Sequence, residues 1–272
     1  MQNKKTLALV ESAVMIAIAT VLSIIKIAEL PYGGSITLAS MLPIAIIAYR
    51  RGTGWGVASA LVYSVIQQLL GLKSLTYVTT WQSILAVILL DYIIAFTVVG
   101  LAGIFRKPVK NQAVALTLGC VLVSVLRYVC HVISGATVWA GLSIPTQAAL
   151  SYSFIYNATY MLPECIILAI SAMYIGSLID FRNEKLTRIK RENIPARFPW
   201  MGITAGFIAC GATIFDVASI FPKIQNAETG EFDITGISNV NWTLVIAVSV
   251  VAAVVAVLLF AIERLIKNTE NG

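Results

Sequence analysis

The residues that could bind a ligand are polar side chains inside otherwise apolar stretches. Asp91 follows AVILL, Arg127 and His131 occur in LRYVCHVISGATVWAG, and Asn157 occurs in SYSFIYNATY. Four residues span about one helical turn, so Arg127 and His131 would share one face of a helix. An ionisable side chain in an apolar environment is costly unless it has a partner, which makes these residues the first candidates for a site.

The composition indicates that the apolar stretches are membrane spans. The chain has 272 residues, of which 58% are hydrophobic and 12% charged, and its mean hydropathy is +0.87. A soluble domain carries about 25% charged residues, and the alternating pattern of a membrane β-barrel is absent. We therefore predict an all-α polytopic protein of the cell membrane, in contact with the lipid bilayer. Its net charge of +6 then concerns membrane topology rather than nucleic-acid binding.

Eight spans of about 20 residues can be drawn along the chain. Their predicted limits are 7–26, 36–49, 53–71, 79–104, 111–134, 147–180, 199–221 and 241–264. Glu11 interrupts the first apolar run, which favours a retained helix over a signal peptide. We predict a six-helix substrate-binding core (1–182), a basic cytoplasmic linker (183–198) and a C-terminal transmembrane hairpin (199–272).

The basic residues predict the orientation of these spans. Of the 19 lysines and arginines, Lys26, Lys73 and Lys223 fall on one side, Arg127 falls inside a span, and the others fall on the opposite side. By the positive-inside rule, both termini are predicted to be cytoplasmic. The loops predicted to face outward are 27–35, 72–78, 135–146 and 222–240.

Depths counted at about 1.5 Å per residue predict a pocket that opens to the outside. Asp91, Arg127 and Asn157 come out at similar depth in the outer half of the bilayer. His131 and Tyr152 form a shallower tier.

The pocket's expected contents point to a class of ligand. Trp139 lies in the outer loop, close enough to cover the pocket. A carboxylate with aromatic rings, Tyr92 among them, suits a cationic aromatic ring, and an amide adds donors and acceptors.

Each candidate also has a purely structural interpretation. Asp91 and Arg127 could neutralise each other, and His131 could be a satisfied core histidine. Trp139 could be an interfacial anchor, and Asn157 an interhelical contact. Only the agreement in depth favours a binding site.

Other polar residues suggest no chemistry of their own. Glu164 follows Pro163 deep in the sixth span and is expected to be a locally satisfied carboxyl at a kink. The four cysteines lack CxxC spacing and are expected to be core residues, not disulfides or a zinc site. No nucleotide-binding loop or hydrolase motif occurs, so the chain is expected to hold no ATPase site and no metal.

Several segments together resemble the thiamine-specific S components, the substrate-binding subunits of energy-coupling-factor (ECF) vitamin transporters. The segments are ESAVMIAIA, ITLASMLPIAIIAYRRGTGWGVASALVYSVI, LLDYIIAFTVVGLAGIFRK, and RYVCHVISGATVWAG followed by SYSFIYNATY, within roughly residues 8–180. The resemblance implies a six-helix fold that binds thiamine from outside with high affinity, without a cofactor or enzymatic activity. It also implies three partners, a transmembrane coupling subunit and two cytosolic ATPases.

The resemblance implies roles for the pocket residues. Asp91 stands where the family has a glutamate and would offset the thiazolium charge or bind the aminopyrimidine. His131 and Trp139 would flank the thiazolium, and Tyr152 and Asn157 would hydrogen-bond the aminopyrimidine.

Further positions match the family or depart from it. Tyr92 matches, Tyr77 and Trp81 are both candidates for the aromatic residue before the fourth span, and Ala13 and Ala17 occupy an AxxxA motif that contacts the coupling subunit. Departures are Gly34, where the family has a tryptophan whose role could pass to Tyr32, Arg127 in place of a lysine, and the hairpin 199–264.

Three alternatives remain open at this point. The fold could bind a thiamine precursor or another heterocycle, or the chain could be an independent secondary transporter. It could also be an intramembrane enzyme that uses Asp91 and His131 as acid and base. Their expected separation of about 10 Å in depth counts against that reading.

Overall fold

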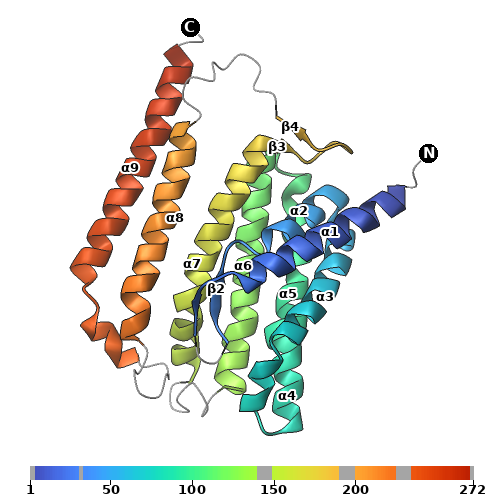
Figure 1. Cartoon of the computed structure of the whole chain (residues 1–272), viewed down its shortest axis with the longest axis vertical. Helices are drawn as coiled ribbons and strands as arrows, with labels where there is room; N and C mark the ends of the chain where they lie inside the picture. Colours follow the sequence, from blue (N-terminus) through green and yellow to red (C-terminus); the bar gives the residue numbers. More distant parts are fainter. Residues whose placement is uncertain (1–3, 31–32, 140–148, 190–199, 225–233, 270–272) are drawn as a thin grey trace.

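The computed structural model describes residues 4–30, 33–139, 149–189, 200–224 and 234–269, and these form a predominantly helical bundle (Figure 1). The long helices are α1 (Lys4–Ile24), α3 (Thr53–Leu70), α6 (Gln112–Thr137), α7 (Ala149–Leu178), α8 (Trp200–Ile220) and α9 (Trp242–Thr269). The short helical segments outside the fourth span are α2 (Leu42–Arg51), η1 (Leu72–Tyr77), η4 (Phe221–Lys223) and η5 (Ile234–Asn239). The predicted all-α membrane fold is confirmed.

The fourth span is one continuous run of helix from Trp81 to Arg106 with changing winding. It consists of α4 (Trp81–Val87), a π-helical segment η2 (Ile88–Ile94), α5 (Ala95–Thr97) and a 3₁₀ segment η3 (Val98–Arg106). π-Helical turns are rare and occur frequently at functional sites. Asp91 lies inside this one.

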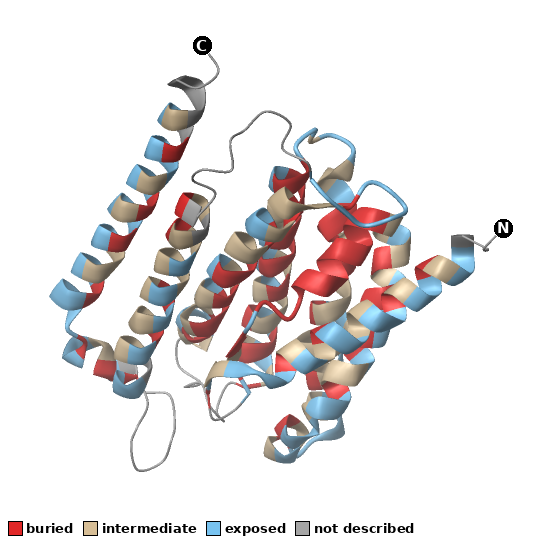
Figure 2. Cartoon of the chain, turned by 45° about the horizontal axis from the view of Figure 1, so that its top comes forward, coloured by how far each residue is buried: buried red, intermediate tan, exposed pale blue. Residues whose placement is uncertain are grey.

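Within the described residues, five helices are long and apolar enough to cross a membrane. They are α1, the Trp81–Arg106 run, α6, α7 and α9, whereas α8 reaches this hydropathy only over the shorter stretch Thr204–Ile220. The predicted span 36–49 is wrong, because α2 has 10 residues and would measure about 15 Å. Helix α2 instead lies buried among the other helices, which explains why its residues 42–49 are apolar on every side (Figure 2).

An antiparallel ribbon precedes α2 where the sequence predicted a loop. Strands β1 (Lys26–Glu29) and β2 (Ser35–Thr37) pair with Lys26 opposite Thr37 and Glu29 opposite Ser35. Leu30 and Ile36 bury their side chains, and β2 lies against α7. The ribbon therefore enters the bundle and forms part of its interior.

Helices α2, α3, η3 and α6 approach one another closely through glycines. A Cβ atom on Gly103 would lie 2.1 Å from the carbonyl oxygen of Ala48, and one on Gly119 would lie 2.0 Å from that of Ala102. Neither distance is sterically possible, so the short spacing between these helices requires glycine at both positions.

Arg50 fixes the end of the bundle at which α2 and α7 terminate. Its guanidinium donates to the carbonyl oxygens of Phe181 (3.1 Å), Asn183 (3.1 Å) and Glu184 (3.2 Å), and it pairs with Glu11 of α1. The three carbonyls belong to the segment around β3 (Ile179–Asp180) and β4 (Thr187–Arg188). A single buried cation thus joins α1, α2 and the end of α7.

Helices α8 and α9 form the predicted C-terminal hairpin and pack side by side, with α8 also against α7 (Figure 1). Ser249 donates a hydrogen bond of 2.7 Å to Asp216 between the two helices. Val217 and Ile224 join the same apolar core as Leu30. The division of the chain into core, linker and hairpin stays a prediction, and residues 190–198 of the predicted linker lie outside the described residues.

We expect Gly103→Ala to destabilise the bundle by about 1–3 kcal/mol, because its Cβ would force η3 away from α2. Gly211→Ala in α8 is the matched control, since nothing lies within 4 Å of its Cβ position. Alanine has a higher helix propensity than glycine at an exposed position, so the melting temperature of the control variant should equal or exceed that of the parent protein. Thermal unfolding in detergent measures both, and equal melting temperatures would contradict the close approach.

Candidate ligand-binding site

A cavity of about 470 Å³ lies among the ribbon, the C-terminal ends of α1 and α3, and the helices η2, α6 and α7. Its volume falls within the range of about 300–1,000 Å³ that is usual for small-molecule sites. Six of the predicted site residues line it: Asp91, Tyr92, Arg127, His131, Trp139 and Asn157.

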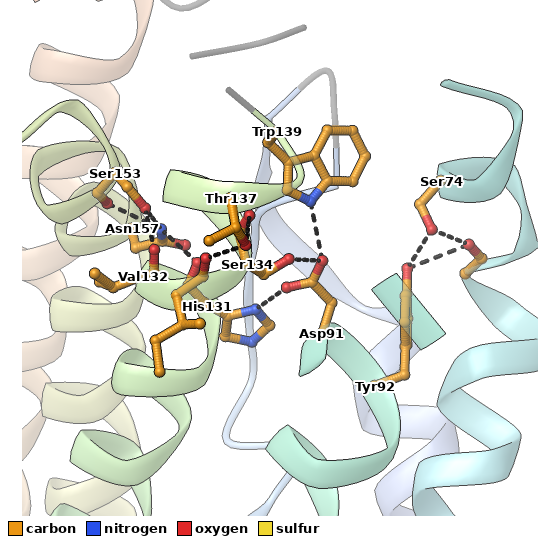
Figure 3. Close-up of polar contacts among 12 residues, drawn as sticks. Ser74, Asp91, Tyr92, His131, Val132, Ser134, Thr137, Trp139, Ser153 and Asn157 are labelled. Carbon is orange, nitrogen blue, oxygen red and sulfur yellow. Dashed lines mark hydrogen bonds and ion pairs between the residues drawn. The ribbon is translucent and has the colours of Figure 1, made fainter. Parts of the chain in front are cut away.

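Asp91 is the centre of the polar contacts at this cavity (Figure 3). One carboxylate oxygen lies 3.0 Å from Nδ1 of His131, and the other accepts hydrogen bonds from Ser134 Oγ (2.7 Å) and Trp139 Nε1 (3.0 Å). All three partners come from α6 or directly follow it. The carboxylate therefore fixes η2 against α6 and holds the Trp139 indole at the cavity.

The predicted depth separation of Asp91 and His131 is wrong, because the two side chains are in contact. Counting residues assumes parallel helices of uniform rise, whereas Asp91 lies in a π-helical turn. Nε2 of His131 is buried and has no hydrogen-bond partner among the described residues. The His131 side chain itself lines the cavity.

Arg127 does not pair with Asp91, contrary to the structural interpretation considered from sequence. Its Nη1 lies 3.3 Å from Oε2 of Glu164, and its guanidinium carbon lies 4.5 Å from the centre of the Phe96 ring. Oε1 of Glu164 accepts a hydrogen bond of 2.7 Å from Thr37. Glu164 therefore has partners for both oxygens, and it lines the cavity, a position that its sequence context did not indicate.

The side-chain amide of Asn157 forms its hydrogen bonds with other groups of the protein. Nδ2 donates to the carbonyl oxygens of Ser153 (2.9 Å) and His131 (3.2 Å), and Oδ1 accepts from the Tyr160 hydroxyl at 2.6 Å. The amide thus positions the backbone of α6 beside His131, and its contact with a ligand stays a prediction.

Tyr160 is a cavity residue that sequence reasoning missed. Its ring lies edge-on to His131, with centroids 6.4 Å apart, and also packs against the ribbon. A Cβ atom on Gly34 would lie 2.8 Å from two of its ring carbons. The absence of a side chain at Gly34 therefore lets the Tyr160 ring lie against the ribbon. In the sequence, the glycine at position 34 was the feature that could have indicated this packing of Tyr160.

The remaining predicted aromatic residues differ in their positions. Tyr92 donates hydrogen bonds to Ser74 Oγ (3.0 Å) and the Gly71 carbonyl (3.2 Å) at the cavity wall. Tyr77 packs beside Trp139, with ring centroids 6.5 Å apart, and Tyr152 belongs to the same apolar cluster.

Three predicted aromatic residues do not line the cavity. Tyr77 and Tyr152 lie behind Trp139 rather than at the cavity surface. Trp81 is 70% exposed and lies away from the cavity, so of the two alternatives Tyr77 is the one next to the site. Tyr32 lies outside the described residues.

In the part of the chain that the structure describes, no three His, Cys, Asp or Glu side chains gather as a metal site would require. The four cysteines are free thiols in helices. The side chains that line the cavity include carboxylates, an arginine, a histidine and aromatic rings.

Known proteins resemble this chain over its first two thirds. A sequence family described as "thiamine transporter protein" matches residues 9–180. The thiamine transporter ThiT of Bacillus subtilis is 36% identical over 180 residues, which cover 62% of this chain and 90% of that protein. ThiT of Lacticaseibacillus paracasei is 27% identical over 172 residues, which cover 57% of this chain and 80% of that protein.

A solved structure of ThiT from Listeria monocytogenes has a similar fold. The two superpose with a TM-score of 0.53 at 24% identity, covering 64% of this chain and 95% of that one. The likeness supports the fold of the core. The family match ends at residue 180, before the C-terminal hairpin.

We expect Gly34→Ala to displace the Tyr160 ring and to lower stability by about 1–3 kcal/mol, because the new methyl group would overlap the ring. Gly54→Ala is the control, since nothing lies within 4 Å of its Cβ position. Thermal unfolding and near-ultraviolet circular dichroism report the two effects. If Gly34→Ala behaves like Gly54→Ala, Tyr160 does not pack as described.

Proposed function

The chain belongs to the thiamine transporter family, and we propose that it is the high-affinity thiamine-binding S component of an ATP-driven ECF importer. The observation that carries the proposal is the way in which the charged side chains of the cavity are paired. Asp91 accepts its hydrogen bonds from a histidine, a hydroxyl and an indole, while the arginine of the same cavity is paired with Glu164. The Asp91 carboxylate is therefore available to a cation.

The ligand that this cavity suits is a flat aromatic cation of modest size. Thiamine carries a permanent positive charge on its thiazolium ring, and a carboxylate beside aromatic faces stabilises such a charge by charge pairing and cation–π contact. Trp139 and His131 supply rings next to Asp91. Lys26 and Glu29 pair with each other at 2.5 Å in the ribbon and add little net charge.

The membrane orientation follows from the basic residues, with both termini cytoplasmic and the cavity open to the outside. The C-terminus and β3–β4 lie at one end of the molecule in Figure 1, and α4 lies at the other. The segment around β3–β4 carries Arg182, Lys185 and Arg188, which is typical of a cytoplasmic end. This assignment supports capture of the ligand from outside.

Energy for uptake would come from partner proteins, a transmembrane coupling subunit and two cytosolic ATPases. Ala13 and Ala17 are exposed on α1, between the exposed side chains of Leu9, Val14 and Ile18. Small residues on an exposed apolar helix let a second helix approach closely. This face is where we propose that the coupling subunit binds.

The comparisons bear on the alternative of an intramembrane enzyme. The distance argument against an intramembrane enzyme fails, because Asp91 and His131 are in contact. Family membership replaces it, since the relatives are named as transporters rather than enzymes. Transport by the isolated chain in liposomes would support a self-sufficient secondary transporter, while a thiamine precursor as ligand is left to competition experiments.

Thiamine should quench the tryptophan fluorescence of the purified protein saturably at micromolar concentration, because it would stack on Trp139. Trp139→Phe should abolish most of the quenching, whereas Trp81→Phe should keep it. Competition by separate pyrimidine and thiazole fragments tests for a precursor. The proposal fails if the parent protein shows neither quenching nor heat of binding.

Asp91→Asn should weaken thiamine binding by about 2–5 kcal/mol, because the ligand would lose the charge that offsets its own. Isothermal titration calorimetry measures the loss. Trp81→Phe again serves as the control that leaves the cavity unchanged. Unaltered affinity in Asp91→Asn would contradict the charge argument.

Ala13→Leu and Ala17→Leu should abolish ATP-driven thiamine uptake by cells that contain the coupling subunit and ATPases, while thiamine binding to the purified protein persists. The larger side chains would block close approach of the coupling subunit. Ala253→Leu, on the exposed face of α9, is the control and should leave uptake unchanged. Equal uptake in all three variants would exclude α1 as the coupling surface.

A further inference from the structure

We propose that Glu164 determines the charge specificity of the cavity by holding Arg127 away from Asp91. The inference rests on the proposed function for the identity of the cationic ligand. The pairing itself can be tested without any ligand. Glu164 acts through Arg127 and is a positioning residue.

The Arg127–Glu164 pair lies in the wall of the ligand cavity, and both residues are buried, with 5% and 4% exposure. Glu164 comes from α7 and Arg127 from α6, and their atoms Oε2 and Nη1 are 3.3 Å apart. Thr37 of the ribbon donates to the other carboxylate oxygen at 2.7 Å and itself contacts Ser40 at 2.8 Å. The carboxylate is therefore held in place independently of the arginine.

Two further contacts direct the guanidinium to the same side. Nη1 of Arg127 lies 2.8 Å from Sδ of Met41, and the Phe96 ring lies beneath the guanidinium carbon at 4.5 Å. Neither Met41 nor Phe96 carries a charge. The only carboxylate within ion-pair distance of Arg127 in the described part of the chain is Glu164.

Without Glu164, the carboxylates that remain on the cavity wall are Asp91 and Glu29, and Glu29 is already paired with Lys26. Arg127 precedes His131 by four residues on α6, about 6 Å along the helix, and His131 touches Asp91 at 3.0 Å. A cation so close to Asp91, away from bulk water, would compete directly with a cationic ligand. Arginine side chains are long enough to turn through this distance.

The charge balance of the cavity leads to the same conclusion. Asp91 and Glu164 contribute two carboxylates and Arg127 one cation, while Lys26 and Glu29 neutralise each other in the ribbon. With His131 counted as neutral, one negative charge is left, located at Asp91, which matches a ligand with a single positive charge. Neutralising Glu164 would leave no net charge and would favour a neutral ligand.

The decisive measurement compares thiamine with a neutral analogue in which a thiophene ring replaces the thiazolium. Glu164→Gln should lower thiamine affinity by about tenfold or more but affect the analogue little, so that the preference for the cation falls. The double variant Glu164→Gln/Arg127→Met should restore the preference. Asp216→Asn, in a partly buried carboxylate contact between α8 and α9, is the control and should not change the preference.

A purely structural role would give a different pattern. If Glu164→Gln lowers both affinities equally, or if the double variant does not restore the preference, the proposal is wrong. Should Glu164→Gln fail to fold, Thr37→Val keeps the carboxylate but removes its anchor, and the same preference should fall by a smaller factor. An unchanged preference in Thr37→Val would then overturn the proposal.

A readout without ligand separates this proposal from thiamine binding. His131 is the only histidine of the chain, so the side-chain NMR signals of labelled histidine report on the Asp91 contact. Glu164→Gln should shift these signals as Arg127 turns towards Asp91, and the double variant should return them to the parent position. Unshifted signals would overturn the proposal even if thiamine binds. If the signals shift but the protein does not bind thiamine, the role of Glu164 is supported and only the proposed function is wrong.

Discussion

The buried ion pair between Arg127 and Glu164 is the interaction on which the character of the cavity depends. A charge inside a membrane bundle must have a partner, because neither lipid nor apolar side chains can solvate it. Arg127 has that partner on the neighbouring helix α7. The carboxylate of Asp91 is therefore left to hydrogen-bond donors that bear no permanent charge, and it can order Trp139 while it retains its own charge.

The ribbon β1–β2 is the second condition for the site, because it brings backbone and hydroxyl groups to a depth where helices alone would present apolar surface. Non-helical backbone is tolerated within a membrane only where it is enclosed by protein or lines a cavity. The ribbon meets the second condition because it lines the cavity, and Leu30 and Ile36 are fully buried while Thr37 reaches Glu164. Gly34 has no side chain and therefore leaves room for the Tyr160 ring beside the ribbon.

The sequence predicted the features that depend on composition and motif, and missed those that depend on helix geometry. Hydropathy identified the long spans and the hairpin, and the spacing of the polar residues identified six side chains that line the cavity. Hydropathy misread α2, because a short helix buried in protein is as apolar as a membrane span. Depth counting missed the Asp91–His131 contact, because that contact depends on π-helical winding. It also missed that Arg127 pairs with Glu164 rather than with Asp91, because that choice depends on helix rotation.

The hairpin α8–α9 bears on the site through the ribbon, although it lies beyond the segment that matches the family. Helix α8 contacts β1, whereas α7 contacts β2, so the two strands are supported by different parts of the chain. Val217 and Ile224 belong to the same apolar core as Leu30 and Ile36, which means that the ribbon cannot move outward without exposing side chains of both regions. A cavity wall supported in this way is stiffer than a loop between two helices, and the position of Thr37 beneath Glu164 depends on that stiffness.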